Sequence, residues 1–399
     1  GELILAFFVY DIYYKNVGVY KFFPIKDSTL YSYYTSRNSG IDEMLEVYNQ
    51  SNETVDPQVA RFLVQFDQDD INTFISDNST TSSINFLFKN YIAFGQGYNL
   101  DTKLEIYPIS GSWDNGTGKF SDSPQSTDGV SWRYRNANDT IEWGFNSNPY
   151  TTQSFNSQFT TEGGGVWFTG SSDNKQIEVT QSFSLRSEKD INVDVTDIAL
   201  AWYSSSNSIG SATDIPNNGF IVKLENINEF TTGSTVNPIS RYFSTDTNTI
   251  YPPELQLRWN DYIDNSSGSS TTNITGSTNN FYASLKESKT EYEQNSITKF
   301  KIGVRPTYPI RTYQTASNYI TNYYLPDNSY YAIKDLDTDE FIIDFHETYT
   351  KISRDSTENY FKIYMNGLEP ERYYKILIKT EYNDITEIID NKLYFKVKK

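Results

Sequence analysis

The 399-residue sequence contains no cysteine and a single histidine. Without cysteine there is no disulfide, no thiolate metal site and no cysteine nucleophile. This fits synthesis in a reducing cytoplasm, although a secreted bacterial protein could also lack cysteine. Because His346 is the only histidine, a zinc site with two histidines is excluded, and a Ser-His-Asp triad would have to use this residue. His346 follows an alternating run, Phe-Ile-Ile-Asp-Phe, so we expect it on a strand or at its end, in a structural role.

Positive charge and long apolar runs are also scarce. The chain has 33 Lys and Arg against 51 Asp and Glu, a net charge of −18. Such a surface repels phosphate backbones and anionic lipids, so we expect neither nucleic acid nor a membrane as partner. Residues 3–10 are apolar but too few to span a bilayer, and Glu2 before them does not fit a signal peptide. We expect residues 1–18 to form an N-terminal extension that adds an edge strand.

Aromatic residues and Asn, Ser and Thr are abundant, with 33 Tyr and 25 Phe. This composition favours strands and turns over helices. From Val19 onward, strand-length runs alternate with clusters of Gly, Asn, Asp and Ser. The predicted strands before residue 264 are 19–24, 60–66, 84–88, 103–108, 176–183, 219–224 and 255–259. Two short helices are predicted, at 69–76 and at 197–203, the second capped by Asp194 or Thr196.

A polar segment, residues 264–280, consists mainly of Ser, Thr, Asn and Gly, and we expect a linker over 264–277. After it, Leu368, Pro370 and Tyr374 have the spacing L-x-P-x-x-x-Y. This resembles the corner before the sixth strand of fibronectin type III and related immunoglobulin-like domains, where the tyrosine hydroxyl bonds back to the corner backbone. Residues 278–399 would form one such domain, usually an adhesive or spacing module. Its seven predicted strands are 281–285, 297–304, 330–335, 340–345, 360–365, 373–382 and 393–397.

Residues 19–263 resemble the DNRLRE-type jelly-roll, a β-sandwich of bacterial surface proteins, carbohydrate-binding modules and phage structural proteins. The resemblance rests on an ordered series of pieces, at 23–31, 38–40, 60–67, 113, 129–132, 194–202, 218–223 and 252–257. Ser244 is followed by Thr245-Asp246, where that family usually has Arg-Glu, so no family ligand site is carried over. The predicted fold is all-β: an N-terminal jelly-roll β-sandwich followed by an immunoglobulin-like β-sandwich.

Taken from Val19 onward, the chain resembles virion structural proteins of contractile-tailed phages that infect marine bacteria. The segments that carry this are 128–132, 163–167, 244–253, 330–337 and 367–375. The resemblance implies a noncatalytic component of the virion, made in the host cytoplasm, at the neck, tail or fibre, without a cofactor. Its expected partners are other virion proteins and further copies of itself, in a symmetric ring or fibre.

Two long polar insertions, 114–128 and 136–161, and the segment after each carry aromatic residues, which usually pack on their own sheet or on a partner. We expect a buried or interface role for these aromatics. The alternative is a glycan-binding platform in a receptor-binding adhesin. The candidates are Trp132, Trp143, Tyr150, Phe155 and Trp167.

Three residues are predicted to be structural: Arg61, Trp202 and Tyr374. Arg61 lies between apolar strand residues and would pair with a buried carboxylate, Asp27 or Asp194. Trp202 would be buried by the second short helix.

Two further functional hypotheses involve acidic residues. The run Asp335, Asp337, Asp339 and Glu340 could bind calcium, but it lacks the glycine and distant glutamate of an EF-hand, and we expect a solvated hairpin turn. A glycosidase or lyase with a carboxylate pair is a third functional hypothesis, although no local spacing marks such a pair.

Overall fold

The computed structural model describes residues 18–50, 58–77, 84–98, 102–144, 151–153, 163–169, 171–172, 175–184, 187–207, 215–225, 229, 238–260, 262–264, 271–273, 281–308, 322–382 and 385–399. The chain divides into two compact units. The N-terminal unit comprises Phe22–Ser76 and Asn85–Gln256, and the C-terminal unit comprises Leu257–Lys399 together with Gly1–Lys21 and Asp77–Ile84. The domain limits expected at 263 and 278 stay a prediction.

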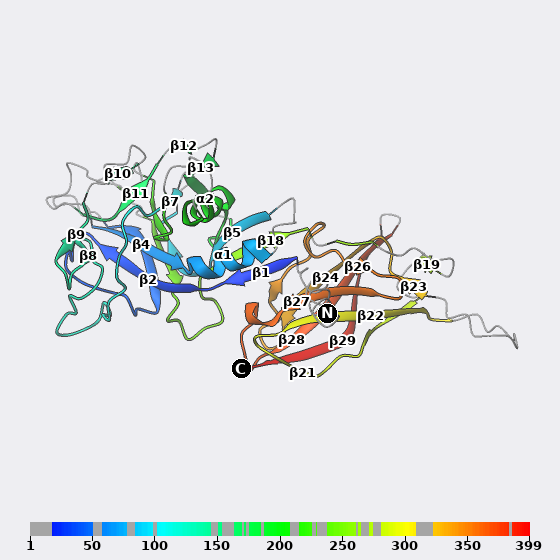
Figure 1. Ribbon diagram of the computed structural model, residues 1–399. Coiled ribbons are helices and arrows are strands. Elements are labelled where there is room, and N and C mark those ends of the chain that lie inside the picture. The colour runs from blue at the N-terminus through cyan, green and yellow to red at the C-terminus, as the bar shows by residue number, and fades with distance from the viewer. Residues whose placement is uncertain are drawn as a thin grey trace, which may run out of the picture. The chain divides into compact units, whose positions relative to one another are not determined.

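The N-terminal unit is built mainly from β-strands (Figure 1). Its larger sheet has the order β14-β7-β16-β4-β3-β17-β6, and β2 pairs with β4. These strands are β2 (Pro24–Tyr31), β3 (Met44–Asn49), β4 (Val59–Phe66), β6 (Ile92–Gln96), β7 (Thr102–Pro108), β14 (Val179–Phe183), β16 (Phe220–Leu224) and β17 (Ile239–Phe243).

A second sheet has the order β1-β18-β5-β15. Its strands are β1 (Val19–Phe22), β18 (Glu254–Trp259), β5 (Ile84–Asn90) and β15 (Ile191–Asp194). The described part of the chain also forms three two-stranded pairs. They join β8 (Tyr134–Asn136) with β9 (Ile141–Glu142), β10 (Thr151–Gln153) with β11 (Val166–Phe168), and β12 (Ser171–Ser172) with β13 (Lys175–Gln176).

The core of the N-terminal unit lies between the two sheets. The Phe88 ring on β5 lies 5.2 Å from the Phe220 ring on β16 and 6.1 Å from the Phe66 ring on β4. β3, β5 and β15 alternate between buried and more exposed residues, whereas β4 and β16 are buried almost throughout. The sheets pack face to face as a β-sandwich.

The two predicted helices are present, as α1 (Gln68–Asp77) and α2 (Thr196–Ser206). Trp202 on α2 is buried, as predicted, with its ring 4.7 Å from that of Phe220. The residue before α2 is Val195, which makes no side-chain cap. Asp194 instead accepts a hydrogen bond of 2.9 Å from the backbone N–H of Thr196, so one of the two predicted capping residues does bond to the first turn.

The C-terminal unit is a second β-sandwich. One sheet has the order β19-β23-β22-β27-β26, with β20 also paired to β22, and the other has the order β21-β29-β28-β24-β25. The strands of the first sheet are β19 (Thr271–Asn273), β20 (Phe281–Lys286), β22 (Ile297–Pro306), β23 (Asn322–Tyr324), β26 (Ser353–Arg354) and β27 (Asn359–Tyr364). Those of the second are β21 (Glu291–Glu293), β24 (Asn328–Asp335), β25 (Phe341–Ile343), β28 (Tyr373–Tyr382) and β29 (Ile385–Lys398).

This strand order is that of an immunoglobulin-like domain. The order β20-β22-β27-β26 corresponds to strands A, B, E and D, and β29-β28-β24 corresponds to G, F and C. Between the sheets, the Tyr331 and Phe361 rings stack at 4.2 Å. The prediction of an all-β chain with an immunoglobulin-like second sandwich is therefore confirmed.

The predicted tyrosine corner is also present. Tyr374, on the sixth strand in this order, is buried, and its hydroxyl donates a 2.9 Å hydrogen bond to the carbonyl of Glu369. Arg372 beside it pairs with Asp335 through two hydrogen bonds of 2.6 and 3.0 Å. The corner is thereby tied to the end of β24.

Candidate functional site

The three tryptophans expected at an interface or glycan platform are buried. Trp132, Trp143 and Trp167 are 0%, 3% and 4% exposed. The Trp143 indole N–H donates to the carbonyl of Ser131, and the Trp167 ring stacks on Tyr107 at 5.6 Å. None of them offers an open ring face to a sugar, so the surface-platform hypothesis is wrong for these three. Tyr150 and Phe155 lie outside the described residues.

These tryptophans surround Arg61, which is also fully buried. Its guanidinium carbon lies 4.8 Å from the Trp132 ring centre, and its Nη1 donates to the carbonyl of Gly164 at 2.7 Å. Gly164 has φ +81°, and a Cβ there would meet the Trp132 ring at 2.7 Å. Only glycine lets the backbone pass this close to the ring.

The carboxylate that pairs with Arg61 is Glu229, not Asp27 or Asp194 as predicted. Nε and Nη2 of Arg61 donate to its two oxygens at 2.6 and 2.9 Å. Lys223 lies 3.6 Å from Glu229 and 2.6 Å from Glu105, so two cations and two anions alternate inside the unit. A buried bidentate pair of this kind is geometrically demanding, and we assign it a structural role.

Asp27 has another partner. Its Oδ2 accepts hydrogen bonds from the Thr245 backbone N–H and hydroxyl, at 2.6 and 2.7 Å. Burial raises the pKa of Asp27 to about 7, although the bonds from Thr245 oppose this. A raised carboxyl pKa can mark a general acid. The 1% exposure of Asp27 leaves a substrate no access, so its raised pKa concerns stability.

Asn38 holds a long loop against the larger sheet. Its Nδ2 donates to the carbonyls of Asn115 and Val130 at 2.7 and 2.8 Å. Its Oδ1 accepts from the N–H groups of Gly40 and Gly118 at 3.1 and 2.8 Å. One buried amide thus satisfies four backbone groups and fixes both the turn after Asn38 and the loop that carries Phe120.

An exposed aromatic cluster lies where these two loops meet. It consists of Tyr33, Tyr34, Arg37 and Phe120, and we call it the aromatic cluster. Tyr33 is 60% and Tyr34 is 37% exposed, and their rings meet edge to face at 4.9 Å. The Phe120 ring lies 5.4 Å from Tyr34 and 4.7 Å from buried Tyr31. Phe120 thus packs on the buried Tyr31, whereas Tyr33 and Tyr34 are exposed to solvent.

Arg37 completes the cluster. Its guanidinium carbon lies 4.1 Å from the Tyr34 ring centre and 4.4 Å from that of Phe120, and its Nη2 donates to Gln125 at 3.5 Å. An arginine between two aromatic faces gains cation–π attraction and is held in one orientation. Tyrosine and arginine are also the side chains most enriched among residues that dominate protein–protein binding energies.

The backbone under the cluster is fixed by hydrogen bonds. Ser32 N–H donates to the Val59 carbonyl at 2.9 Å, and the Ser32 hydroxyl accepts from the Val59 N–H at 2.8 Å. The Phe120 N–H donates to the Asp42 carboxylate at 2.9 Å. Burial is the main cause that raises the pKa of Asp42. Tyr33 and Tyr34 are thus presented on a pre-organised turn, which lowers the entropy lost on binding.

Sequence reasoning singled out other aromatics in and after the polar insertions, so it passed over Phe120 within 114–128. Tyr33 and Tyr34 lie outside the insertions, just after Ser32 at the end of strand β2. Three tyrosines within four residues at the end of a strand are a usable signal, because alternation allows only part of such a run to face the core.

The described residues hold no recognisable catalytic constellation. His346 lies after β25, where its Nδ1 accepts from the N–H groups of Thr348 and Tyr349 at 3.1 and 3.3 Å. Burial is the main cause that lowers the pKa of His346. Its ring stacks on Tyr349 at 4.3 Å, which supports the structural role expected for it.

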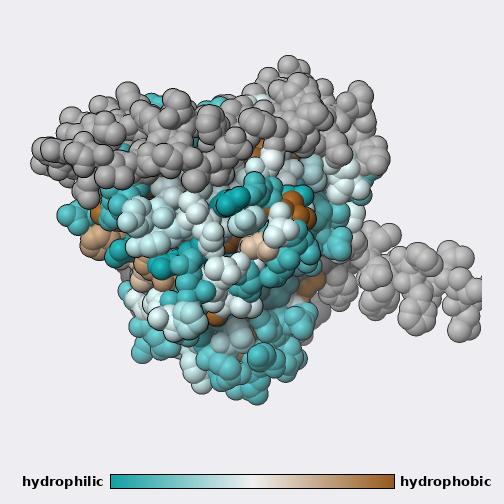
Figure 2. Space-filling view, turned by 90° about the vertical axis from the view of Figure 1, so that its left-hand side faces the viewer, coloured by the Kyte–Doolittle hydropathy of each residue, from teal (hydrophilic) through white to brown (hydrophobic). Residues whose placement is uncertain are grey.

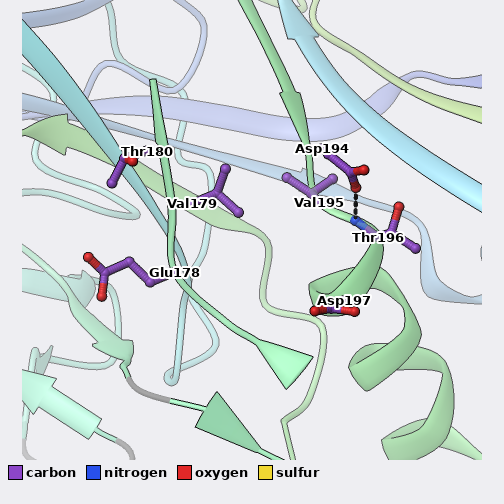
Figure 3. Close-up of a pocket in the computed structure, with 7 residues that line it drawn as sticks. All are labelled: Glu178, Val179, Thr180, Asp194, Val195, Thr196 and Asp197. Carbon is purple, nitrogen blue, oxygen red and sulfur yellow. Dashed lines mark hydrogen bonds between the residues drawn. The ribbon is translucent and has the colours of Figure 1, made fainter. Parts of the chain in front are cut away.

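An acidic cavity of about 410 Å³ lies between β14 and the start of α2 (Figure 3). Glu178 and Asp197 lie on opposite sides of it in this view, while Asp194 is engaged by the Thr196 N–H and by Asn85. Within the described ranges, no group of three or more His, Asp or Glu residues is placed to hold a metal ion.

The acidic run 335–340 forms the turn between β24 and β25, as expected. Asp335 accepts the N–H groups of Asp337 and Thr338 at 2.9 and 3.0 Å, besides pairing with Arg372. Burial opposes ionisation, but Arg372 and these N–H groups lower the pKa of Asp335 below its ordinary value. Its oxygens are therefore committed to holding the turn.

Figure 2 shows one face of the molecule, on which the described surface is largely hydrophilic and hydrophobic residues form only small separate spots. A contact surface on this face would have to depend on tyrosine, arginine and hydrogen bonding more than on an aliphatic patch. No helix in the described part of the chain is long and apolar enough to cross a membrane.

Comparison with known proteins gives no relative: no family model, no curated protein and no solved structure matches the chain.

Proposed function

We propose that the chain is a noncatalytic structural component of a phage particle and that it assembles through protein–protein contacts, at the neck, tail or fibre. The observation that carries the proposal is the aromatic cluster. Tyr33 and Tyr34 are exposed, yet they are packed on Phe120 and Arg37 and held by a backbone-bonded turn. A rigid, exposed tyrosine–arginine surface on a β-sandwich is the chemistry of a contact site.

The second sandwich supports the same role. Its immunoglobulin-like strand order and tyrosine corner are those of a folding and spacing module. Fold alone does not define function. The contact surface and the sequence resemblance to virion proteins support the structural role.

Burial of the tryptophans weakens the glycan-binding alternative. It required exposed tryptophan faces, and the three described candidates are buried. Tyr33 and Tyr34 could stack on a sugar, but their rings pack edge to face on neighbours, which leaves no flat paired platform.

The test is incorporation into particles. The gene for the wild-type protein or for a Tyr33→Ala/Tyr34→Ala variant is supplied to a host that produces particles lacking the chain, and purified particles are analysed by quantitative mass spectrometry. We expect the wild type at a fixed copy number and the variant at least tenfold less, because two contact aromatics are lost. Tyr394→Ala, which removes another exposed tyrosine, is the matched control. Absence of the wild-type protein from particles would refute the proposal.

A further inference from the structure

The outer face of β3 and β17 is exposed at one end of the larger sheet. β3 pairs with β17, and β17 pairs with β6, the last strand in the described order. Along β3 and β17, buried residues such as Leu45 and Tyr242 alternate with residues that point outward. The outward residues, which we call the outer patch, are Met44, Glu46, Tyr48, Ile239, Arg241 and Phe243.

The outer patch is electrically neutral, although the unit that carries it is strongly acidic. Glu46 and Arg241 are the only charged residues of strands β3, β6 and β17. The ranges of the N-terminal unit as a whole carry 28 Asp and Glu against 13 Lys and Arg. Copies of such a unit repel one another over most of their surface. Two copies can bring their outer patches together without this cost, because one positive and one negative charge balance on each.

The two charged residues lie side by side and keep free bonding groups. Arg241 is directly opposite Glu46 in the strand register, and its Nε donates to Glu46 Oε1 at 2.6 Å. Within the described residues, the Nη groups of Arg241 and the other oxygen of Glu46 make no further hydrogen bond. Phe94 on β6 lies on the other side of Arg241, with its ring centre 5.6 Å from the guanidinium carbon. The pair can therefore bind a second arginine–carboxylate pair that faces it in the reverse order.

The register of β3 and β17 makes the outer patch complementary to itself. Met44 lies two residues from Glu46, and Ile239 lies two residues from Arg241, on opposite sides of the charged pair. A half-turn about an axis through the middle of this pair exchanges the two antiparallel strands. It therefore places Arg241 of one copy over Glu46 of the other and Met44 of one copy over Ile239 of the other. Charges of opposite sign and apolar side chains thus meet in one twofold arrangement.

We propose that two copies of this chain associate through their outer patches about a twofold axis. Arg241 of each copy binds Glu46 of the other, and Met44 of each packs on Ile239 of the other. The occupant is a second copy because neutrality and self-complementarity are combined on this one face of an acidic unit. This inference goes beyond the proposed function, since it names another surface and its partner and applies to the isolated protein.

The outer patch is continuous with the aromatic cluster. The buried Tyr31 ring lies 6.3 Å from the ring of Tyr48 in the patch and 4.7 Å from the ring of Phe120 in the cluster. Interfaces of stable complexes involve about 20–30 residues on each side, and the patch is smaller than this. We therefore expect a weak dimer, with a dissociation constant in the micromolar range.

The test measures self-association of the full chain by sedimentation velocity between about 1 and 100 μM. We expect the wild type to form a dimer and no larger species. Arg241→Glu and Glu46→Arg should each weaken dimerisation at least tenfold, because each places like charges across the contact. Arg133→Glu is the matched control, since it makes the same change in the exposed Arg133–Glu142 pair outside the patch. It should stay within about twofold of the wild type.

Exchange of the charges distinguishes this twofold contact from any other. An equal mixture of Arg241→Glu and Glu46→Arg chains should form heterodimers, because one chain then presents two glutamates and the other two arginines. A single chain with both substitutions should form homodimers within about threefold of wild-type affinity, since each exchanged residue again meets its opposite. Failure of both to recover association would overturn the proposal, as would wild-type species larger than a dimer.

Because the chain has no cysteine, engineered cysteines provide a second readout with the charged pair intact. A short bis-maleimide should join Met44→Cys/Ile239→Cys chains into covalent dimers at least fivefold more than Met44→Cys/Ile141→Cys chains, whose second cysteine is equally exposed but outside the patch. Equal cross-linking of the two, or a wild-type chain that stays monomeric to about 100 μM, would refute the contact. A monomer found at fixed copy number in particles would refute it while leaving the proposed function intact.

Discussion

The buried carboxyl of Asp27 predicts an unusual pH dependence of stability. Its pKa is raised from an ordinary 3.8 to about 7, mainly by burial. The folded protein therefore binds more protons than the unfolded chain between these values. The contribution of Asp27 to the free energy of unfolding is greatest below about pH 4 and falls as pH rises toward 7, by about 1.4 kcal/mol per unit, or about 4 kcal/mol in all.

Asp27→Asn should remove this loss. An asparagine Oδ1 can accept the two hydrogen bonds that Thr245 donates, and it carries no charge at any pH. At pH 4 the variant and the wild type should have similar stability, and at pH 8 the variant should be more stable by up to about 4 kcal/mol. Glu188→Gln, on the exposed surface, is the matched control and should follow the wild type.

The assay is urea unfolding between pH 4 and 8, followed by tryptophan fluorescence. Five of the six tryptophans lie in the N-terminal unit, at 113, 132, 143, 167 and 202, so the signal reports mainly on the unit that contains Asp27. If the difference in free energy of unfolding between wild type and Asp27→Asn does not change with pH, the assignment of Asp27 as a buried carboxyl with a raised pKa is wrong.

Three further substitutions test the fold that presents the contact surface. Arg61→Met leaves Glu229 buried without its bidentate partner and should cost about 3–5 kcal/mol in urea unfolding, so a loss below about 1 kcal/mol would contradict the network. Tyr374→Phe removes the bond to Glu369 and should cost about 1–2 kcal/mol in thermal unfolding of the C-terminal unit; no loss would mean that the corner bond does not matter. Asn38→Ala removes four hydrogen bonds and should accelerate limited proteolysis within residues 111–133, whereas an unchanged cleavage pattern would show that the loop is held by other contacts.

The strands with a clear apolar pattern were predictable, because that pattern follows from burial in a core. β4 is an apolar run buried almost throughout and β28 alternates in its first half, and both match their predicted ranges within a residue. β3 and β17 were missed because their sequences mix polar and apolar residues. Glu46 on β3 and Arg241 on β17 form a cross-strand pair at 2.6 Å, and such a pair becomes visible only when the register is known.

The partner of Arg61 illustrates a second limit. A buried guanidinium requires a carboxylate, and this much follows from the sequence around it. Glu229 is 168 residues away and is not marked by any local spacing, so the choice among 51 acidic residues depends on the tertiary fold.

The sequence allowed both a buried and an interface position for the tryptophans, and it could not decide between them for a similar reason. Trp132 and Trp167 come from glycine-rich segments that resemble surface loops, but the backbone at Gly164 passes against the Trp132 ring and turns both indoles toward Arg61. Composition identifies a loop, whereas only the path of its backbone decides which aromatic side chains it exposes.

The most direct test of the account is a high-resolution image of the assembled particle by electron cryomicroscopy. We predict that the chain occupies symmetry-related positions in it and that Tyr33, Tyr34 and Arg37 are buried against a neighbouring subunit. Particles in which no density fits the two sandwiches, or in which these side chains face open solvent in every copy, would contradict it.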